Sequence, residues 1–314
     1  MADISTKYLG LQLKSPLIAA SSGLTDNLEN LKRFEKYGVG AIVLKSLFEE
    51  EIILEKEAKL AKMSSSGFLY PETLEFYDYH EDVEHESTLQ YLNLVKKAKS
   101  SLNIPVIPSI NCVTSENWTY FPRELEMAGA DALELNVFIM PSDLNRTKEE
   151  TELVYFNIIK EVTRQVKIPV ALKVSFYFSD LALMLKKFSE TEIKGLVLFN
   201  RFYSPDIDVD TLEVTSSSVL SNPSDISNSL RWIGILHDIV SCDLCGTTGV
   251  HDGKGMVKLL LAGATAVQVA SAFYKKGVDY AEKMLIELEN WMDEKKFNTI
   301  ADFKGIMSQH ETAN

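Results

Sequence analysis

Short apolar runs recur along the chain, and amphipathic stretches separate them. Most of the runs are continuously apolar, which is typical of parallel strands that are covered on both faces. Eight runs predict strands, at residues 16–20, 41–45, 105–111, 132–136, 170–174, 195–200, 240–246 and 266–270.

The stretches between these runs have helical spacing. They cover residues 27–37, 87–100, 118–128, 148–166, 179–188, 228–238 and 255–262, and a last one spans 278–295. A strict alternation of strand and helix implies a parallel sheet, and eight rounds favour a closed (β/α)8 TIM barrel over an open sheet. We therefore expect an α/β fold in which residues 1–314 form a single domain.

Two segments near the C-terminus each combine an apolar run with small residues and a following helical stretch. Residues 245–250 read Cys-Gly-Thr-Thr-Gly-Val, and residues 264–271 read Ala-Thr-Ala-Val-Gln-Val-Ala-Ser. Small residues leave backbone N–H groups accessible, and a helix N-terminus favours an anion. As the last two turns of a barrel, the segments predict a phosphate site. A side chain at Gly249 is expected to occupy the position of the phosphate.

Two connections are unusually long for a compact domain. Residues 47–86 follow the second predicted strand, and residues 201–227 follow the sixth. Both begin at the carboxyl ends of strands, where the active sites of barrels lie. We expect active-site loops, with disordered insertions as the alternative.

Polar residues end several of the predicted strands. A buried lysine or asparagine is costly without a partner, so a group of them at one mouth of the barrel indicates a site for an anionic, hydrogen-bonding ring system. These residues are Lys45, Ser46, Asn111, Asn136, Lys173 and Asn200.

Charge and composition restrict the partners. A formal net charge of -13 argues against a surface for nucleic acid or anionic lipid. No run approaches the ~20 apolar residues of a membrane span, and the N-terminus lacks a signal-peptide pattern, so we expect a cytoplasmic protein. Cys242 and Cys245 lie in a strand-like run, which favours buried strand residues over a zinc or redox site. No metal site is expected.

With these residues in view, the chain resembles the dihydroorotate dehydrogenase family, FMN-containing barrels of pyrimidine synthesis. The likeness is strongest at residues 22–23, 45–46, 134–136, 169–173 and 246–277. It implies FMN as the cofactor and dihydroorotate, or a similar small molecule, as the substrate. In the family, the residues that line the flavin or the pyrimidine match Ser22, Lys45, Ser46, Asn136, Lys173 and Asn200. Those that contact the ribityl phosphate match Ser221, Asn222, Thr248, Gly249, Ala270 and Ser271.

The resemblance makes Lys173 and Asn136 the expected catalytic residues. Hydride transfer to N5 leaves negative charge at N1 and O2 of the flavin, and an ammonium beside that edge stabilises the charge. The family places Lys173 there. Asn136 and Asn200, joined by Asn111, are expected to hold the polar edge of the substrate, and Lys45 is expected to contact it too.

The proton acceptor of the family is missing. Relatives carry a Cys or Ser base directly before a proline in the loop after the fourth strand. Here the loop is one residue longer and Met140 precedes Pro141, and a thioether cannot accept a proton at neutral pH. We take Ser142 as the candidate base, with Asp143 and Cys112 as alternatives.

Further departures lie on the substrate side. Arg201 stands where the family has Ser or Thr, and Asn222 where it has glycine. Three functions therefore remain open. They are a dihydroorotate dehydrogenase with a displaced base, an FMN oxidoreductase of the same superfamily on another substrate, and a barrel that binds FMN or another phosphorylated ligand without catalysis. In the second, Arg201 would grip a carboxylate or phosphate.

The electron acceptor also remains open. Soluble relatives pass electrons to fumarate or, through an iron–sulfur partner subunit, to NAD. The three cysteines of this chain cannot hold a four-cysteine cluster. Relatives of this kind are often homodimers, so a homodimer is an expectation here.

Overall fold

The computed structural model describes residues 2–48, 86–112, 121–201, 205–216 and 219–309. Nearly all of the predicted loop 47–86 and the start of the predicted helix 118–128 lie outside the described residues. No helix among the described residues combines the length and the apolar composition needed to cross a bilayer.

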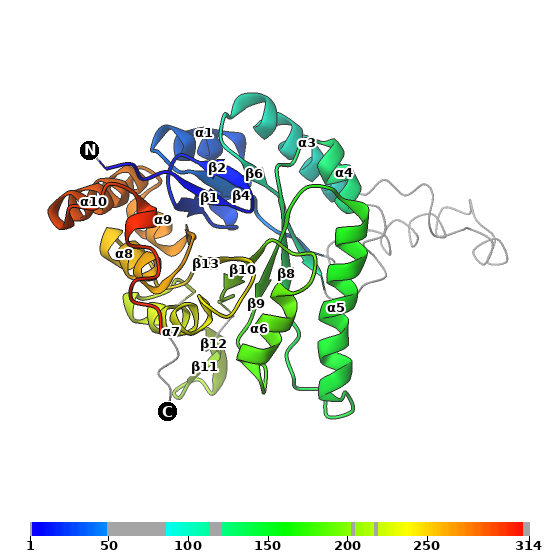
Figure 1. Cartoon of the computed structure of the whole chain (residues 1–314). Helices are drawn as coiled ribbons and strands as arrows, with labels where there is room; N and C mark the ends of the chain where they lie inside the picture. Colours follow the sequence, from blue (N-terminus) through cyan, green and yellow to red (C-terminus); the bar gives the residue numbers. More distant parts are fainter. Residues whose placement is uncertain (1, 49–85, 113–120, 202–204, 217–218, 310–314) are drawn as a thin grey trace.

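Ten parallel strands form one sheet that curls into a barrel (Figure 1). In sheet order they are β5 (Leu47–Phe48), β7 (Ser109–Cys112), β8 (Leu133–Val137), β9 (Val170–Val174), β10 (Gly195–Leu198), β13 (Asp243–Gly246), β14 (Ala266–Val269), β3 (Leu17–Ala19), β4 (Ala41–Val43) and β6 (Val106–Ile107). The ring closes because β4 pairs with β6 while β5, further along the same segment, pairs with β7. The predicted TIM barrel and its eight strands are confirmed.

One predicted strand, 105–111, is divided into β6 and β7. The division falls at Pro108, which has no N–H to donate to a neighbouring strand. Its carbonyl still accepts a hydrogen bond from the N–H of Glu134 at 2.9 Å, so the segment continues along the barrel wall.

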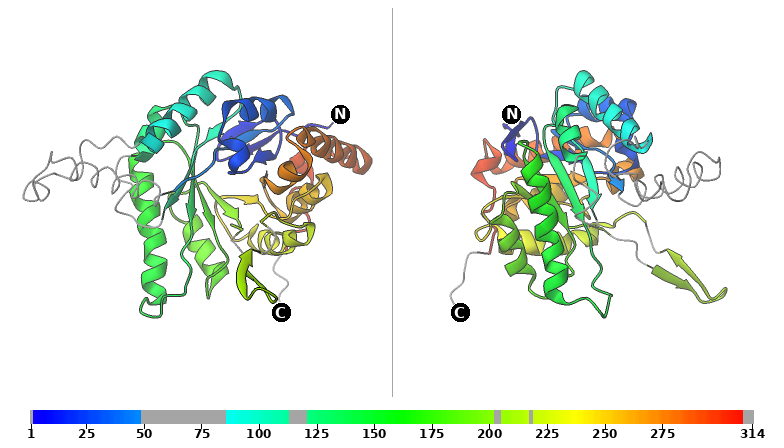
Figure 2. Two further views of the ribbon diagram at one scale, coloured as in Figure 1. Left: turned by 180° about the vertical axis from the view of Figure 1, so that it is seen from behind. Right: turned by 90° about the vertical axis from the view of Figure 1, so that its right-hand side faces the viewer.

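Helices cover the outside of the barrel (Figures 1 and 2). They are α1 (Leu28–Lys36), α3 (Glu86–Ser101), α4 (Phe121–Met127), α5 (Lys148–Gln165), α6 (Leu181–Ser189), α7 (Ile226–Leu236), α8 (Gly253–Ala262), α9 (Ser271–Lys276) and α10 (Tyr280–Lys295). Local chemistry sets their ends. The capping box of Thr147 and Glu150 begins α5, and Gly263, at φ 118°, ends α8.

An N-terminal hairpin that the sequence pattern did not reveal closes one end of the barrel. It consists of β1 (Thr6–Tyr8) and β2 (Leu11–Leu13), which pair antiparallel. Its buried Tyr8, Leu9 and Leu13 pack against inward-facing residues near the amino ends of the strands, several of them alanines, and we call this cluster the plug layer. The site must therefore lie above this layer, toward the carboxyl ends.

The second long connection, 201–227, contains structure of its own. An antiparallel hairpin of β11 (Pro205–Asp208) and β12 (Glu213–Ser216) extends from the barrel, as the right-hand view of Figure 2 shows. A short 3-10 helix, η3 (Pro223–Asp225), then leads directly into α7.

Candidate active site at the carboxyl ends of the strands

Strand alternation directs three polar side chains into the barrel. Glu134, Lys173 and Gln268 each lie two residues after an alanine of the plug layer, on β8, β9 and β14 respectively. Because side chains repeat their direction every second residue along a strand, all three point inward, one layer above the plug.

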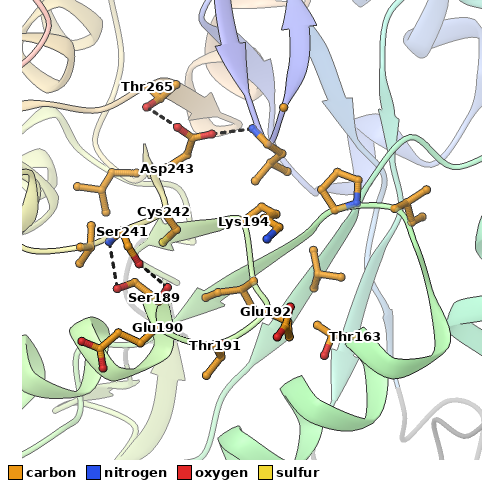
Figure 3. Close-up of a pocket in the computed structure, with 18 of the residues that line it drawn as sticks. Thr163, Ser189, Glu190, Thr191, Glu192, Lys194, Ser241, Cys242, Asp243 and Thr265 are labelled. Carbon is orange, nitrogen blue, oxygen red and sulfur yellow. Dashed lines mark hydrogen bonds between the residues drawn. The ribbon is translucent and has the colours of Figure 1, made fainter.

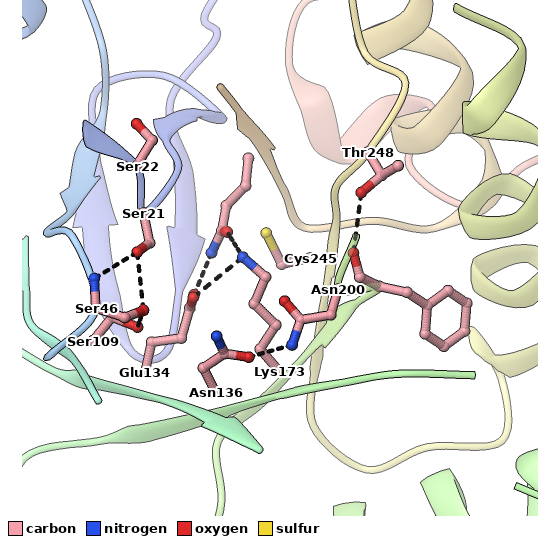
Figure 4. Close-up of polar contacts among 12 residues, drawn as sticks. Ser21, Ser22, Ser46, Ser109, Glu134, Asn136, Lys173, Asn200, Cys245 and Thr248 are labelled. Atoms are coloured by element: carbon pink, nitrogen blue, oxygen red, sulfur yellow. Dashed lines mark hydrogen bonds and ion pairs between the residues drawn. The ribbon is translucent and has the colours of Figure 1, made fainter. Parts of the chain in front are cut away.

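These three side chains contact one another in the barrel interior. The Lys173 Nζ lies 3.2 Å from Gln268 Oε1 and 3.4 Å from Glu134 Oε1, and Gln268 Nε2 donates to Glu134 Oε2. Figure 4 shows Lys173 beside Glu134. The exposed fractions are 7% for Lys173 and 1% for each of the other two. The lysine is thus an ammonium held at the floor of the barrel mouth by a buried carboxylate.

Sequence reasoning did not assign Glu134 and Gln268 to the site. The signal was present, because a carboxylate and an amide interrupt the apolar strands Leu-Glu-Leu and Val-Gln-Val. A buried polar residue in a strand interior needs a partner, and here the partner is Lys173.

A cavity of about 150 Å³, which we call the upper cavity, lies above Lys173. It brings together Lys173, the two small-residue turns and the ends of β3 and β10. Of the predicted site residues, it is lined by Lys173, Asn200, Arg201, Ser221, Thr248, Gly249, Ala270 and Ser271.

The turn after β13 presents free backbone donors to this cavity. Thr248 and Gly249 adopt consecutive positive φ values of 70° and 79°, and both residues line the cavity. Neither N–H donates to any other described residue, whereas the hydroxyl of Thr248 donates to the Phe199 carbonyl at 3.1 Å.

The structure corrects the expectation for Gly249. A Cβ there would lie 2.1 Å from the backbone N of Ile226, at the start of α7, rather than in the space for a phosphate. A side chain would therefore force apart the turn and the helix start, and any effect on a ligand would follow from that displacement.

Ser221 joins the two walls of the upper cavity. Its N–H donates to the Ser271 hydroxyl at 3.0 Å, its own hydroxyl lies 3.0 Å from His251 Nε2, and its carbonyl accepts from Lys275 Nζ at 2.7 Å. Burial, followed by the charge of Lys275, lowers the pKa of His251, which keeps the imidazole neutral at pH 7. His251 is a third residue of the site that sequence reasoning missed, after Glu134 and Gln268.

Amide side chains on β7 and β8 and just after β10 lie beside the upper cavity. Asn200 Nδ2 donates to Asn136 Oδ1 (Figure 4), and Asn111 is the strand-register partner of Asn136. The structure therefore groups the three asparagines as expected, although their roles stay predictions.

Three serines, Ser21, Ser46 and Ser109, form a cluster of contacting hydroxyl groups. The hydroxyl of Ser46 lies 2.7 Å from that of Ser109 and 3.1 Å from that of Ser21. Ser22 instead caps the 3-10 helix η1 (Gly23–Thr25), accepting from the N–H of Leu24 at 3.3 Å.

Other predicted site residues lie at the rim or outside. The Lys45 and Asn222 side chains are exposed. Arg201 donates through Nη1 to the Val219 carbonyl, and its Nε lies 3.6 Å from Asp225 Oδ2. This arginine therefore sits at the cavity wall with one carboxylate nearby.

The loop that should carry the base does not reach the upper cavity. Ser142 is exposed, and its N–H donates to the Met140 carbonyl at 2.8 Å. Met140 and Asp143 line a separate hollow of about 190 Å³ beside Tyr177. Cys112 ends β7, but its side chain lies outside the described residues. Ser142 stays a prediction.

A cavity larger than the upper cavity lies at the other end of the barrel (Figure 3). It measures about 920 Å³ and is lined by residues at the amino ends of strands, among them Lys194, Cys242 and Asp243. Burial raises the pKa of Cys242 to about 12, so its thiol is not ionised at neutral pH. Cys245 is a buried strand residue, and both thiols are free.

A family model described as dihydroorotate dehydrogenase matches residues 3–292. Curated relatives named dihydroorotate dehydrogenase B (NAD(+)), catalytic subunit, come from Thermoplasma volcanium and Thermoplasma acidophilum. Each is 26% identical to this chain, with 98% of this chain and 99% of the relative covered. A relative of the same name from Methanocella arvoryzae is 27% identical over 91% of this chain and 92% of its own length.

The buried lysine and the paired small-residue turns line one cavity, and the family model matches nearly the whole barrel. The chain belongs to the dihydroorotate dehydrogenase family, whose members are generally flavin-dependent, and it is an oxidoreductase of this kind.

Proposed function

We propose that this chain binds FMN in the upper cavity and oxidises dihydroorotate or a close analogue. The observation that carries the proposal is the placement of Lys173. Its ammonium lines the same cavity as the Thr248–Gly249 turn and the start of α9, so one ligand can meet a cation at one end and phosphate-binding groups at the other.

The residues present fit FMN. The free N–H groups of Thr248 and Gly249, with Ser221, Ala270 and Ser271, would hold the phosphate. Lys173 and Asn136 would contact the polar edge of the ring. When bound, FMN would supply the hydride acceptor. Lys173, held at the floor of the cavity, would stabilise negative charge on the neighbouring ring edge.

The substrate would lie toward the asparagines. The relatives' names include dihydroorotate, whose ring carries amide groups and a carboxylate. Asn136 and Asn200, already in contact, would bind the amide edge, and Arg201 at the cavity wall would bind the carboxylate. Arg201 and Met140, both departures from the family, also support a second candidate, a different anionic substrate oxidised by the same flavin.

Ser142 is our proposal for the base, with Asp143 and Cys112 as alternatives. Ser142→Ala is expected to lower flavin reduction by about 10²–10⁴-fold, the usual contribution of a general base, without loss of FMN. Asp143→Asn and Cys112→Ala, prepared in parallel, would locate the base if Ser142→Ala retained its full rate.

Anaerobic titration tests the function directly. We expect the purified protein to be yellow and to bleach on addition of dihydroorotate. A yellow protein that dihydroorotate leaves unchanged but another anionic substrate bleaches would favour the second candidate. A colourless protein that fails to take up added FMN would contradict both.

We further propose a cytoplasmic homodimer, which cell fractionation and sedimentation would test. The relatives are named NAD(+)-linked catalytic subunits, so NAD(+) is the first acceptor to assay, with fumarate as the comparison.

A further inference from the structure

We propose that Glu134 and Gln268 form a positioning pair that fixes the Lys173 ammonium at the floor of the upper cavity. The inference deepens the proposed function and rests on it where the flavin is concerned. The three side chains come from β8, β9 and β14, and β10 and β13 lie between β9 and β14 in the sheet. The contact between Lys173 and Gln268 therefore spans the barrel interior.

The hydrogen bonds among the three groups allow only one pattern. Lys173 can only donate, and the ionised Glu134 can only accept. Gln268 does both, because its Oε1 accepts from Lys173 while its Nε2 donates to Glu134. Both carboxylate oxygens thus face a donor, Nζ at Oε1 and the amide nitrogen at Oε2. A glutamine at position 134 would place its amide nitrogen opposite another donor, either Lys173 Nζ or Gln268 Nε2, and no hydrogen bond could form there.

The titratable groups around the Glu134–Lys173 ion pair are uncharged. Tyr8, Tyr91 and Cys245 interact electrostatically with Glu134, but burial raises the pKa of each of them well above neutrality, so all three are uncharged. Within the described part of the chain, Glu134 is the only carboxylate in ion-pair distance of Lys173. Removing either partner would leave a buried charge without compensation.

The position of Nζ needs such support. A lysine has a flexible four-carbon stem and a point charge that selects no geometry by itself. Tethers from opposite sides of the barrel hold Nζ between Glu134 and Gln268. This places it where the cavity begins, since Lys173 and Gln268 both line that cavity. Glu134 and Gln268 are therefore positioning residues that act through Lys173.

A charge-conserving exchange tests the arrangement. Glu134→Gln and Gln268→Glu each break one contact, but they change the local charge in opposite directions. In the double variant E134Q/Q268E, the new glutamate accepts from Lys173 and from the new amide, and the new amide oxygen accepts from Lys173. All three contacts and the net charge are restored with the two roles exchanged.

In the flavin-loaded protein, we expect both single variants to reduce their flavin about 10- to 100-fold more slowly and the double variant to recover most of the rate. The midpoint potential of the flavin should move in opposite directions in the two single variants, because their charge changes are opposite, and should return in the double. A double variant as slow as the singles would overturn the proposal. The proposal would also be overturned if one single variant reduced its flavin faster and the other more slowly, in step with the midpoint potential, because the change of charge alone would then explain the rates.

A second readout needs no flavin. In apoprotein, labelling of Lys173 by an amine-reactive acetylating reagent, read by peptide mass spectrometry, should rise several-fold in Glu134→Gln, where Nζ loses its carboxylate partner, and return in the double variant. Unchanged labelling in Glu134→Gln would overturn the positioning pair even in a protein that bound no FMN. Raised labelling in a protein that never bound FMN would instead retain the pair and reject the proposed function.

Discussion

The two sides of the candidate site differ in the groups that form them, which are main chain and small side chains on one side and loop side chains on the other. On the side of β13 and β14, the upper cavity is walled by main chain and small side chains, with Thr248 and Gly249 presenting N–H groups. On the side of β8, the loop from Met140 onward is exposed, and the family resemblance leads us to expect the base on this loop. Main-chain recognition depends on the fold and survives sequence divergence, whereas side-chain chemistry on a loop can change one residue at a time.

The largest effect is expected where the two sides meet. Lys173→Ala should slow flavin reduction by about 10²–10³-fold, the usual result of removing one preorganised group that stabilises developing charge. Stopped-flow absorbance would measure the rate, and circular dichroism would confirm the fold. Lys160→Ala, at an exposed position of α5, is the control. An unaltered rate would show that the flavin lies elsewhere.

On the phosphate side, Gly249→Ala should weaken FMN binding by about tenfold or more. The Cβ would lie 2.1 Å from the Ile226 nitrogen, so the turn must move, in addition to the cost of about 1 kcal/mol for a side chain at positive φ. Gly10→Ala is the matched control, because Gly10 has φ +80° with nothing within 4 Å of a Cβ. Fluorescence titration of apoprotein measures the affinity, and equal affinity in both variants would disprove the role of the turn.

On the substrate side, Arg201→Gln should raise KM by about 10-fold, within the range for a lost charge-assisted hydrogen bond, and leave FMN affinity unchanged. Steady-state kinetics separates KM from kcat. Arg231→Gln, at an exposed position of α7, controls for net charge. If FMN were lost instead, Arg201 would belong to the cofactor side.

The smallest effect is expected at His251. Because its pKa is lowered in the folded protein, the unfolded chain takes up a proton first as the pH falls below the ordinary value of 6.5. The free energy of unfolding should therefore decrease with falling pH in this range, and His251→Gln should reduce that dependence. Urea unfolding between about pH 5 and 8 would measure it, and identical slopes would assign the pH dependence to other groups.

Sequence periodicity was enough to predict the barrel but not the elements and contacts in its interior. Continuous apolar runs and intervening helical patterns located all eight wall strands, and the small residues at 246–249 and 270–271 indicated the two turns that line the upper cavity. The N-terminal hairpin escaped notice because its strands are three residues each, too short for a periodic signal. Local pattern is strong where an element repeats its environment over many residues.

The sequence by itself determined the barrel, the family and the residue types at the mouth, because these follow from pattern and from residues adjacent in the chain. Only the tertiary structure decided which of those residues meet. Glu134 and Gln268 are 134 positions apart and join at Lys173, and His251 reaches Ser221 across 30 positions, whereas Lys45 and Ser142 end exposed. The reason is physical. Closing the barrel sets the inward direction and depth of each strand residue, and neither quantity is encoded locally.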